Sequence, residues 1–231
     1  GFTSIAIVSL LTYFLALRCP DISKILLTAL TLRISLILVG HYFITLPDTT
    51  ADAESFEGYA WSLGRDGFFT LIDRFMGPDP YFISWFVGIA YSLLGRSILL
   101  AQSISLFFGM ACIYLAWLLA KKLWNDRVAN TVGWTIAIFP SLVLYSIIVM
   151  REVYICFFIL LALHGVVGWS KTYNFKSVVL AIFGFVGAVF FHGGMIVGLI
   201  VFAVIFGLVS LKLFMKSLVS YRINFKIMIF I

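Results

Sequence analysis

The sequence predicts an all-α fold: a polytopic helical membrane protein with about seven transmembrane helices. Hydrophobic residues make up 63% of the 231 positions, and the mean hydropathy is +1.12. Several apolar runs exceed the roughly 18 residues that mark a membrane-spanning helix. Seven of the ten acidic residues fall between positions 47 and 80, in a polar stretch flanked by apolar runs. We interpret residues 1–231 as a single transmembrane domain. We expect it to be part of a longer protein, because it starts without methionine and ends inside an apolar run.

The apolar runs give the order of the predicted helices. Transmembrane helices are expected at 1–17, 25–46, 97–120, 128–149 and 153–169. The last run, 178–211, is too long for a single crossing of a hydrocarbon core about 30 Å thick. His192 and the two glycines that follow it predict a turn there, which gives two short helices. Residues 47–96 form the acidic loop between the second and third helices.

Residues 81–94 decide on which side of the membrane this acidic loop lies. This apolar run has 14 residues and is rich in aromatic side chains, which suits a juxtamembrane helix at the headgroup level. If it does not cross, the later basic residues lie opposite the acidic loop. They are Lys121, Lys122, Arg127, Lys171, Lys176, Lys212, Lys216, Arg222 and Lys226. The positive-inside rule then makes the side of these basic residues cytoplasmic and the acidic loop extracytoplasmic. We expect the protein in the cytoplasmic (inner) membrane.

Three carboxylates of the loop are candidates for chemistry. Asp52 could cap a helix that begins at Ala53, with Glu54 in its first turn, where acids suit the helix dipole. Alternatively, a carboxylate held near the membrane could serve as a general base. Asp48, at the outer end of the second predicted helix, is another candidate base, and the sequence does not rank Asp48 against Asp52.

Charged residues near the apolar runs offer binding groups. Arg151 and Glu152 open a predicted helix, where they could snorkel and complement the helix N-terminus, or Arg151 could bind a lipid phosphate. Arg33 lies inside a predicted membrane helix, so it either snorkels or has an interior or functional role. His192 at its turn is an interfacial residue or a ligand. The three cysteines have no CxxC spacing and predict neither a disulfide framework nor a zinc site.

Three passages together carry a family resemblance. The first is the acidic motif from Asp52 to Trp61. The second begins at Pro80-Tyr81, continues through Leu93-Leu94-Gly95-Arg96-Ser97 and leads to a helix that ends in Lys121-Lys122. The third contains Phe139-Pro140-Ser141 and closes on Arg151-Glu152. In this order the chain resembles the N-terminal portion of the GT-C superfamily of membrane glycosyltransferases, which includes protein mannosyltransferases and the lipid A aminoarabinose transferase.

The resemblance implies transfer of a sugar from a polyprenyl-phosphate donor to an acceptor on the extracytoplasmic face. Asp52 matches the family's loop acid, with Glu54 and Asp48 as further catalytic candidates. A set of neighbouring residues is expected to bind substrate: Arg151, Glu152, His192, Tyr59 and Arg96. Arg151 or a divalent metal ion would neutralise the donor phosphate, and no residue is assigned as a metal ligand.

The expected partners are membrane lipids and the lipid-linked sugar donor. Nucleic acid is not expected, because basic excess in a membrane protein marks cytoplasmic loops. The alternative function is a non-catalytic structural subunit of a membrane protein complex. A transporter is disfavoured, since polar residues are scarce at mid-membrane depth.

Overall fold

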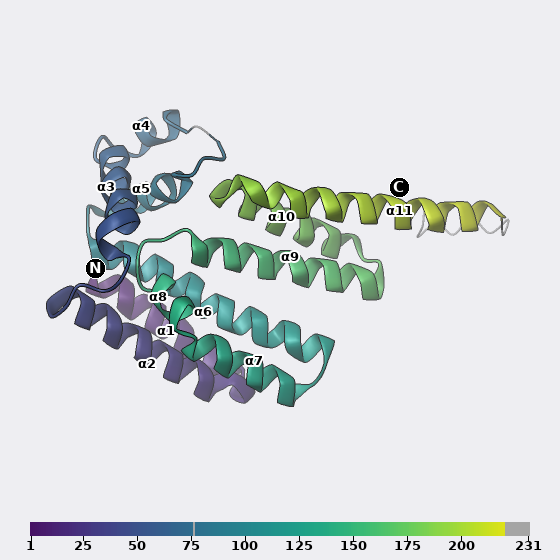
Figure 1. Cartoon of the computed structure of the whole chain (residues 1–231), viewed down its shortest axis with the longest axis horizontal. Coiled ribbons are helices and arrows are strands. Elements are labelled where there is room, and N and C mark those ends of the chain that lie inside the picture. The colour runs from purple at the N-terminus through teal and green to yellow at the C-terminus, as the bar shows by residue number, and fades with distance from the viewer. Residues whose placement is uncertain (76, 220–231) are drawn as a thin grey trace.

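The computed structural model describes residues 1–75 and 77–219, and every regular element in them is helical (Figure 1). Of the basic residues used to predict the topology, Arg222 and Lys226 lie outside the described residues. Four segments are long and apolar enough to cross a membrane: Pro20–Tyr42, Ile98–Leu123, Glu152–Thr172 and Gly193–Lys212. Phe2–Arg18, Phe82–Leu94 and Phe175–Phe191 are shorter apolar helices. The chain is therefore a helical integral membrane protein.

The elements divide into a bundle and a cap. The bundle consists of α1 (Phe2–Arg18), α2 (Pro20–Tyr42), α6 (Ile98–Leu123), α7 (Asp126–Ile138), α8 (Pro140–Tyr145), α9 (Glu152–Thr172), α10 (Phe175–Phe191) and α11 (Ile196–Val219). The cap, which Figure 1 shows at one end of the bundle, consists of η1 (Thr49–Ala53), α3 (Glu54–Gly64), α4 (Phe68–Asp73) and α5 (Phe82–Leu94). The apolar run predicted to turn at His192 does so: a single 3₁₀ turn, η2 (Gly193–Met195), separates α10 from α11.

Helix α5 belongs to the cap. Its 13 residues rise about 20 Å, less than the roughly 30 Å of a hydrocarbon core. It packs closely against α3, because a Cβ atom at Gly64 would lie 2.7 Å from the carbonyl oxygen of Gly88. The Ser84 hydroxyl donates to the Phe56 carbonyl oxygen at 2.8 Å, and the Trp85 indole donates to the Leu71 carbonyl oxygen at 2.9 Å. These contacts bind α5 to α3 and to α4.

The predicted continuous helix over 128–149 is wrong: the helix breaks at Phe139, and the short helix α8 that follows ends at Tyr145. The backbone there is extended, with ψ 120°, and a new short helix begins at Pro140. Proline has no amide hydrogen and disfavours a helical conformation in the residue before it. The break leaves carbonyl groups at the end of α7 without their usual helical partners.

Arg33 satisfies those carbonyl groups from the neighbouring helix α2. Its Nη1 donates to the Ala137 carbonyl oxygen at 2.8 Å, and its Nη2 lies 3.4 Å from that of Ile136. Its Nε donates to the Ser146 hydroxyl, also at 2.8 Å. With the side chain 1% exposed, Arg33 does not snorkel. It has the interior role that the sequence left open.

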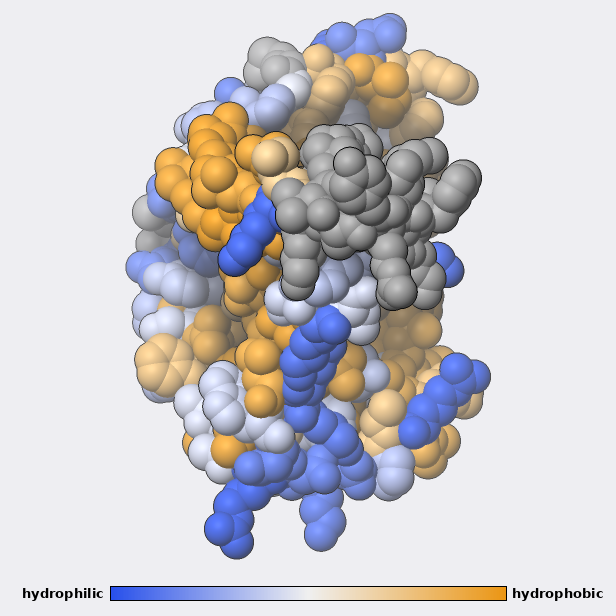
Figure 2. Space-filling model, turned by 90° about the vertical axis from the view of Figure 1, so that its right-hand side faces the viewer, coloured by the Kyte–Doolittle hydropathy of each residue, from blue (hydrophilic) through white to orange (hydrophobic). Residues whose placement is uncertain are grey.

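The two ends of the bundle differ in charge. Helix α6 begins next to the cap, and its last turn contains Lys121, whose ammonium group lies 3.0 Å from Asp21 and 2.8 Å from Asp126. Lys171 donates to the Lys122 carbonyl oxygen there at 2.7 Å. Figure 2 looks onto this end and shows hydrophilic side chains gathered among apolar ones. The basic end of α6 is thus separated from the acidic cap by the length of the helix.

Candidate functional site

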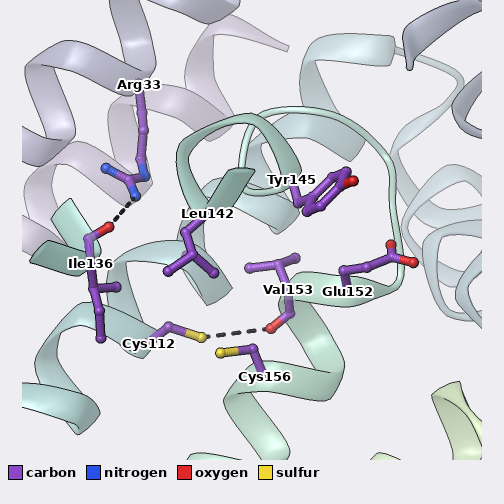
Figure 3. Close-up of a pocket in the computed structure, with 9 residues that line it drawn as sticks. Arg33, Cys112, Ile136, Leu142, Tyr145, Glu152, Val153 and Cys156 are labelled. Carbon is purple, nitrogen blue, oxygen red and sulfur yellow. Dashed lines mark hydrogen bonds between the residues drawn. The ribbon is translucent and has the colours of Figure 1, made fainter. Parts of the chain in front are cut away.

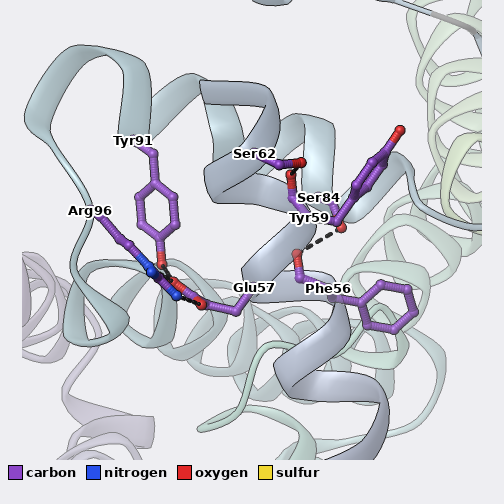
Figure 4. A network of polar contacts seen from close by, with 7 residues as sticks. All are labelled: Phe56, Glu57, Tyr59, Ser62, Ser84, Tyr91 and Arg96. Carbon is purple, nitrogen blue, oxygen red and sulfur yellow. Dashed lines mark hydrogen bonds and ion pairs between the residues drawn. The ribbon is translucent and has the colours of Figure 1, made fainter. Parts of the chain in front are cut away.

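A three-residue polar cluster holds the cap to the start of α6 (Figure 4). Glu57, on α3, is 7% exposed and accepts two hydrogen bonds from Arg96, at 3.0 Å from Nε and 2.8 Å from Nη2. The hydroxyl of Tyr91, on α5, donates to the same carboxylate at 2.8 Å. The arrangement is a bidentate carboxylate–guanidinium pair with an additional neutral donor.

The surroundings of Glu57 shift the pKa of all three groups. Burial raises the pKa of the Glu57 carboxyl, but hydrogen bonds from Arg96 and Tyr91 outweigh burial, and the pKa falls below its ordinary value. Burial and the bond to Glu57 raise the pKa of Tyr91. The same carboxylate raises the pKa of Arg96. Arg96, a predicted substrate-binding residue, is therefore already engaged by Glu57 in this structure.

The two candidate bases, Asp52 and Asp48, are exposed to solvent. The expectation that Asp52 caps α3 is wrong. The residue at the N-cap position of α3 is Ala53, whose backbone is helical, and no side chain caps this helix end with a hydrogen bond. Asp52 instead lies within the π-helical turn η1, which continues directly into α3. Asp48 has a positive φ of 60°, which aspartate tolerates better than most residues. Both carboxylates are accessible, but neither lines the grooves described below.

Glu54 lies on a groove beside the cap, with a volume of about 490 Å³. Residues 40–46, which end α2 and lead away from it, form one wall, and Ile98 and Gln102 of α6 contribute from the other side. Gln102 is 8% exposed, and its Oε1 has no hydrogen-bond partner within the described residues. Of the three catalytic candidates, Glu54 is the one that faces a groove.

Arg151 and Glu152 form a loose pair at the start of α9, with 3.8 Å between Nε and Oε1. The other oxygen of Glu152 is buried and has no partner in the described part of the chain. Glu152 and Arg33 line the same small cavity, of about 30 Å³, together with Cys112 and Cys156 (Figure 3). That volume is sufficient for a single water molecule.

Tyr59 lies in a narrow pocket of the cap that also contains Arg74, Asp79 and Tyr81. The rings of Tyr59 and Tyr81 meet edge to face, with centroids 5.4 Å apart. Arg74 is paired with Asp66 at 2.8 Å. This pocket supplies hydroxyl, guanidinium and carboxylate groups close to the apolar groove described next.

An apolar groove of about 340 Å³ adjoins that pocket and shares three of its aromatic residues, Phe75, Phe82 and Trp85. Phe86 of α5 and residues of α6, α9 and α10 form the remaining walls, and no polar side chain contributes to the lining. Phe82 and Phe191 meet with ring centroids 4.9 Å apart, which joins the cap to the C-terminal end of α10. The groove has the composition and size of a site for a hydrocarbon chain.

His192 is exposed at the turn after α10 and lines none of these pockets. Among the described residues, no group of three or more histidine, cysteine, aspartate or glutamate side chains is placed to hold a metal ion. The predicted site residues are therefore spread over the cap end of the bundle and do not converge on one cavity.

Sequence reasoning did not identify Glu57 or Gln102 as site residues, and it did not find the aromatic groove. Gln102 carried a signal, because it is an amide inside an otherwise apolar predicted helix. The groove residues Phe183, Val186, Gly187 and Phe190 also recur at helical spacing along α10. Glu57 could not be distinguished from its acidic neighbours, since only the packing of α3 on α5 buries it.

Comparison with protein-family models, curated proteins and solved structures gives no match for this chain.

Proposed function

We propose that this chain is an integral-membrane, glycosyltransferase-like protein that takes a sugar from a polyprenyl-phosphate donor on the extracytoplasmic face. The observation that carries the proposal is the aromatic groove, which is apolar throughout and adjoins a small pocket of the cap, of about 20 Å³, that Tyr59, Arg74 and Asp79 help to line. A lipid-linked sugar has the same division into a hydrocarbon chain and a polar head. The donor's isoprenoid chain would lie along α10, and its phosphate and sugar would reach the cap.

The chemistry assigned to the cap is general-base catalysis. Asp52, exposed and in the segment that resembles the family's acidic motif, would take the proton of an acceptor hydroxyl. The acceptor oxygen bonds to the anomeric carbon as the bond from that carbon to the phosphate oxygen breaks. The polyprenyl phosphate leaves with the electron pair. Arg151 is 29% exposed by side chain and would neutralise the charge that develops on the phosphate.

A second candidate function is a non-catalytic subunit of a membrane complex. Two observations favour it: Arg96 is neutralised by Glu57, and the predicted site residues do not share one cavity. In that case the aromatic groove would hold structural membrane lipid.

The proposal is tested by filling the groove. Val186 lines it and is 36% exposed, so Val186→Trp adds bulk without displacing the core. We expect a loss of at least about tenfold in the affinity for a polyprenyl phosphate, measured by native mass spectrometry of protein in nanodiscs. Val179→Trp, also on α10 but outside the groove and 47% exposed, is the matched control. Equal affinities of the two variants, or displacement of the polyprenyl phosphate by ordinary phospholipid, would favour the subunit.

A further inference from the structure

The groove that contains Glu54 is separate from the aromatic groove and has a different character. The residues that line it include a carboxylate, Glu54, an amide, Gln102, and a hydroxyl, Thr49. No lysine or arginine contributes to the lining. The two grooves have no lining residue in common.

The end of α2 adds further hydrogen-bond acceptors to this groove. The last helical turn leaves carbonyl oxygens without helical partners, and the negative end of the helix dipole lies there. The amides of Phe43 and Ile44 both return to the Val39 carbonyl oxygen, so they do not satisfy the carbonyl groups that follow it. A ligand in this groove therefore meets these acceptors together with groups that can donate, among them the His41 imidazole, the Thr45 hydroxyl and the Gln102 amide nitrogen. It must both donate and accept hydrogen bonds.

Gln102 is the observation that indicates a ligand. Its side chain is more than nine-tenths buried, lines the groove and carries an Oε1 with no hydrogen-bond partner within the described residues. A buried acceptor without a partner is unfavourable, and such groups in native proteins call for an explanation such as a ligand or an ion. A ligand that donates to this amide would remove the cost.

We infer that the groove between the end of α2 and the start of α6 binds a carbohydrate headgroup, recognised by Glu54 and Gln102. Sugar hydroxyls both donate and accept hydrogen bonds, which suits this mixed lining, while the exposed rings of Tyr42 and Phe43 flank the groove with apolar surface. A phosphate is disfavoured, since no lysine or arginine lines the groove and the Glu54 carboxylate would repel it. A metal ion alone would leave most of about 490 Å³ unused and finds a single carboxylate.

The inference rests on the proposed function, which it deepens: it gives the chemical class of the acceptor and the place where it binds. Donor and acceptor would occupy different grooves on the cap end of the bundle. Substitutions at one groove should therefore leave binding at the other unchanged.

The test uses the full chain in nanodiscs and four soluble probes, the methyl glycosides of glucose, galactose, mannose and N-acetylglucosamine. We expect saturation-transfer NMR to detect at least one of them. Glu54→Gln and Gln102→Leu should each weaken that binding at least tenfold, and Asp73→Asn, exposed on α4, should not. The thermal midpoint of Gln102→Leu should equal or exceed that of the wild type, because an unpartnered buried acceptor has been removed.

Several outcomes would overturn the inference: no glycoside binds the wild type, both groove variants bind like the wild type, or binding requires added Ca²⁺. A Gln102→Leu variant that unfolds easily yet binds normally would assign Gln102 a purely structural role. Glycoside binding lost in these variants, with no polyprenyl phosphate bound by any form, would keep this site and reject the proposed donor. Donor binding blocked by Val186→Trp, with glycoside binding unaffected by the groove variants, would reject this site alone.

Discussion

Glu57 in the cap and Arg33 in the bundle are both charged and both buried, at 7% and 1% exposure, yet their partners differ. Glu57 meets an opposite charge, and the partner's side chain remains half exposed to solvent. Arg33 meets carbonyl and hydroxyl oxygens, and none of its hydrogen bonds goes to a carboxylate within the described residues. In the cap, the partly exposed guanidinium group of Arg96 neutralises the buried carboxylate. In the bundle, the carbonyl dipoles at the end of the broken helix stabilise the buried guanidinium group.

The comparison shows why each charge lies where it does. A charge at membrane depth is costly unless it faces the protein interior and finds polar partners. The break at Pro140 supplies such partners, so Arg33 and the break depend on each other. Glu57 and Arg96 lie at the end of the bundle, where their pairing joins α3 to the start of α6 at a lower desolvation cost.

The largest effect is expected at Arg33. Arg33→Met leaves the carbonyl groups of Ala137 and Ile136 without a donor in the bundle interior. At about 1–3 kcal/mol for each buried group left unsatisfied, we expect a loss of about 3 kcal/mol in the free energy of unfolding in mixed micelles. Arg18→Met, an exposed arginine at the end of α1, is the control and should change stability by less than about 0.5 kcal/mol. Similar stabilities of the two variants would mean that Arg33 does not stabilise the break.

A smaller effect is expected at Glu57. Glu57→Gln removes the charge and should lower the free energy of unfolding by about 1–2 kcal/mol. This is less than two fully buried charged hydrogen bonds would contribute, because the side chain of Arg96 is half exposed to solvent. A double-mutant cycle with Arg96→Gln isolates the pair, and we expect a coupling of about 1 kcal/mol. Additive losses would show that the two side chains stabilise the cap independently of each other.

The smallest effect is a change in the pH dependence. The pKa of Glu57 is lowered below 4.5 in the folded state. The contribution of Glu57 to folding stability is therefore fully present above pH 4.5 and is lost as the pH falls through the lowered pKa. The thermal midpoint of the wild type should therefore fall more steeply on acidification below pH 4.5 than that of Glu57→Gln. Arg33→Met should keep the wild-type slope, since Arg33 stays charged throughout this range. Parallel curves for the wild type and Glu57→Gln would contradict the lowered pKa.

Local composition and length were enough to predict several features. The apolar runs predicted the long helices, and the 14 residues at 81–94 proved to be a short helix packed against α3. His192 with its two glycines predicted the turn between α10 and α11. These features follow from hydrophobicity and chain geometry within one segment, so a single sequence contains the information.

Other features required the tertiary structure, because they depend on which helices pack together. Nothing local distinguishes Glu57 from Glu54, yet the packing of α3 on α5 buries one and leaves the other facing a groove. The partners of Arg33 at the helix break, Ile136, Ala137 and Ser146, lie more than 100 residues away, and the sequence does not give the depth of that break in the bundle. The aromatic groove likewise forms only where α5, α6, α9 and α10 meet. Hydrophobicity determines which segments are helices, and side-chain packing between distant segments determines which polar groups become partners and which remain available to a ligand.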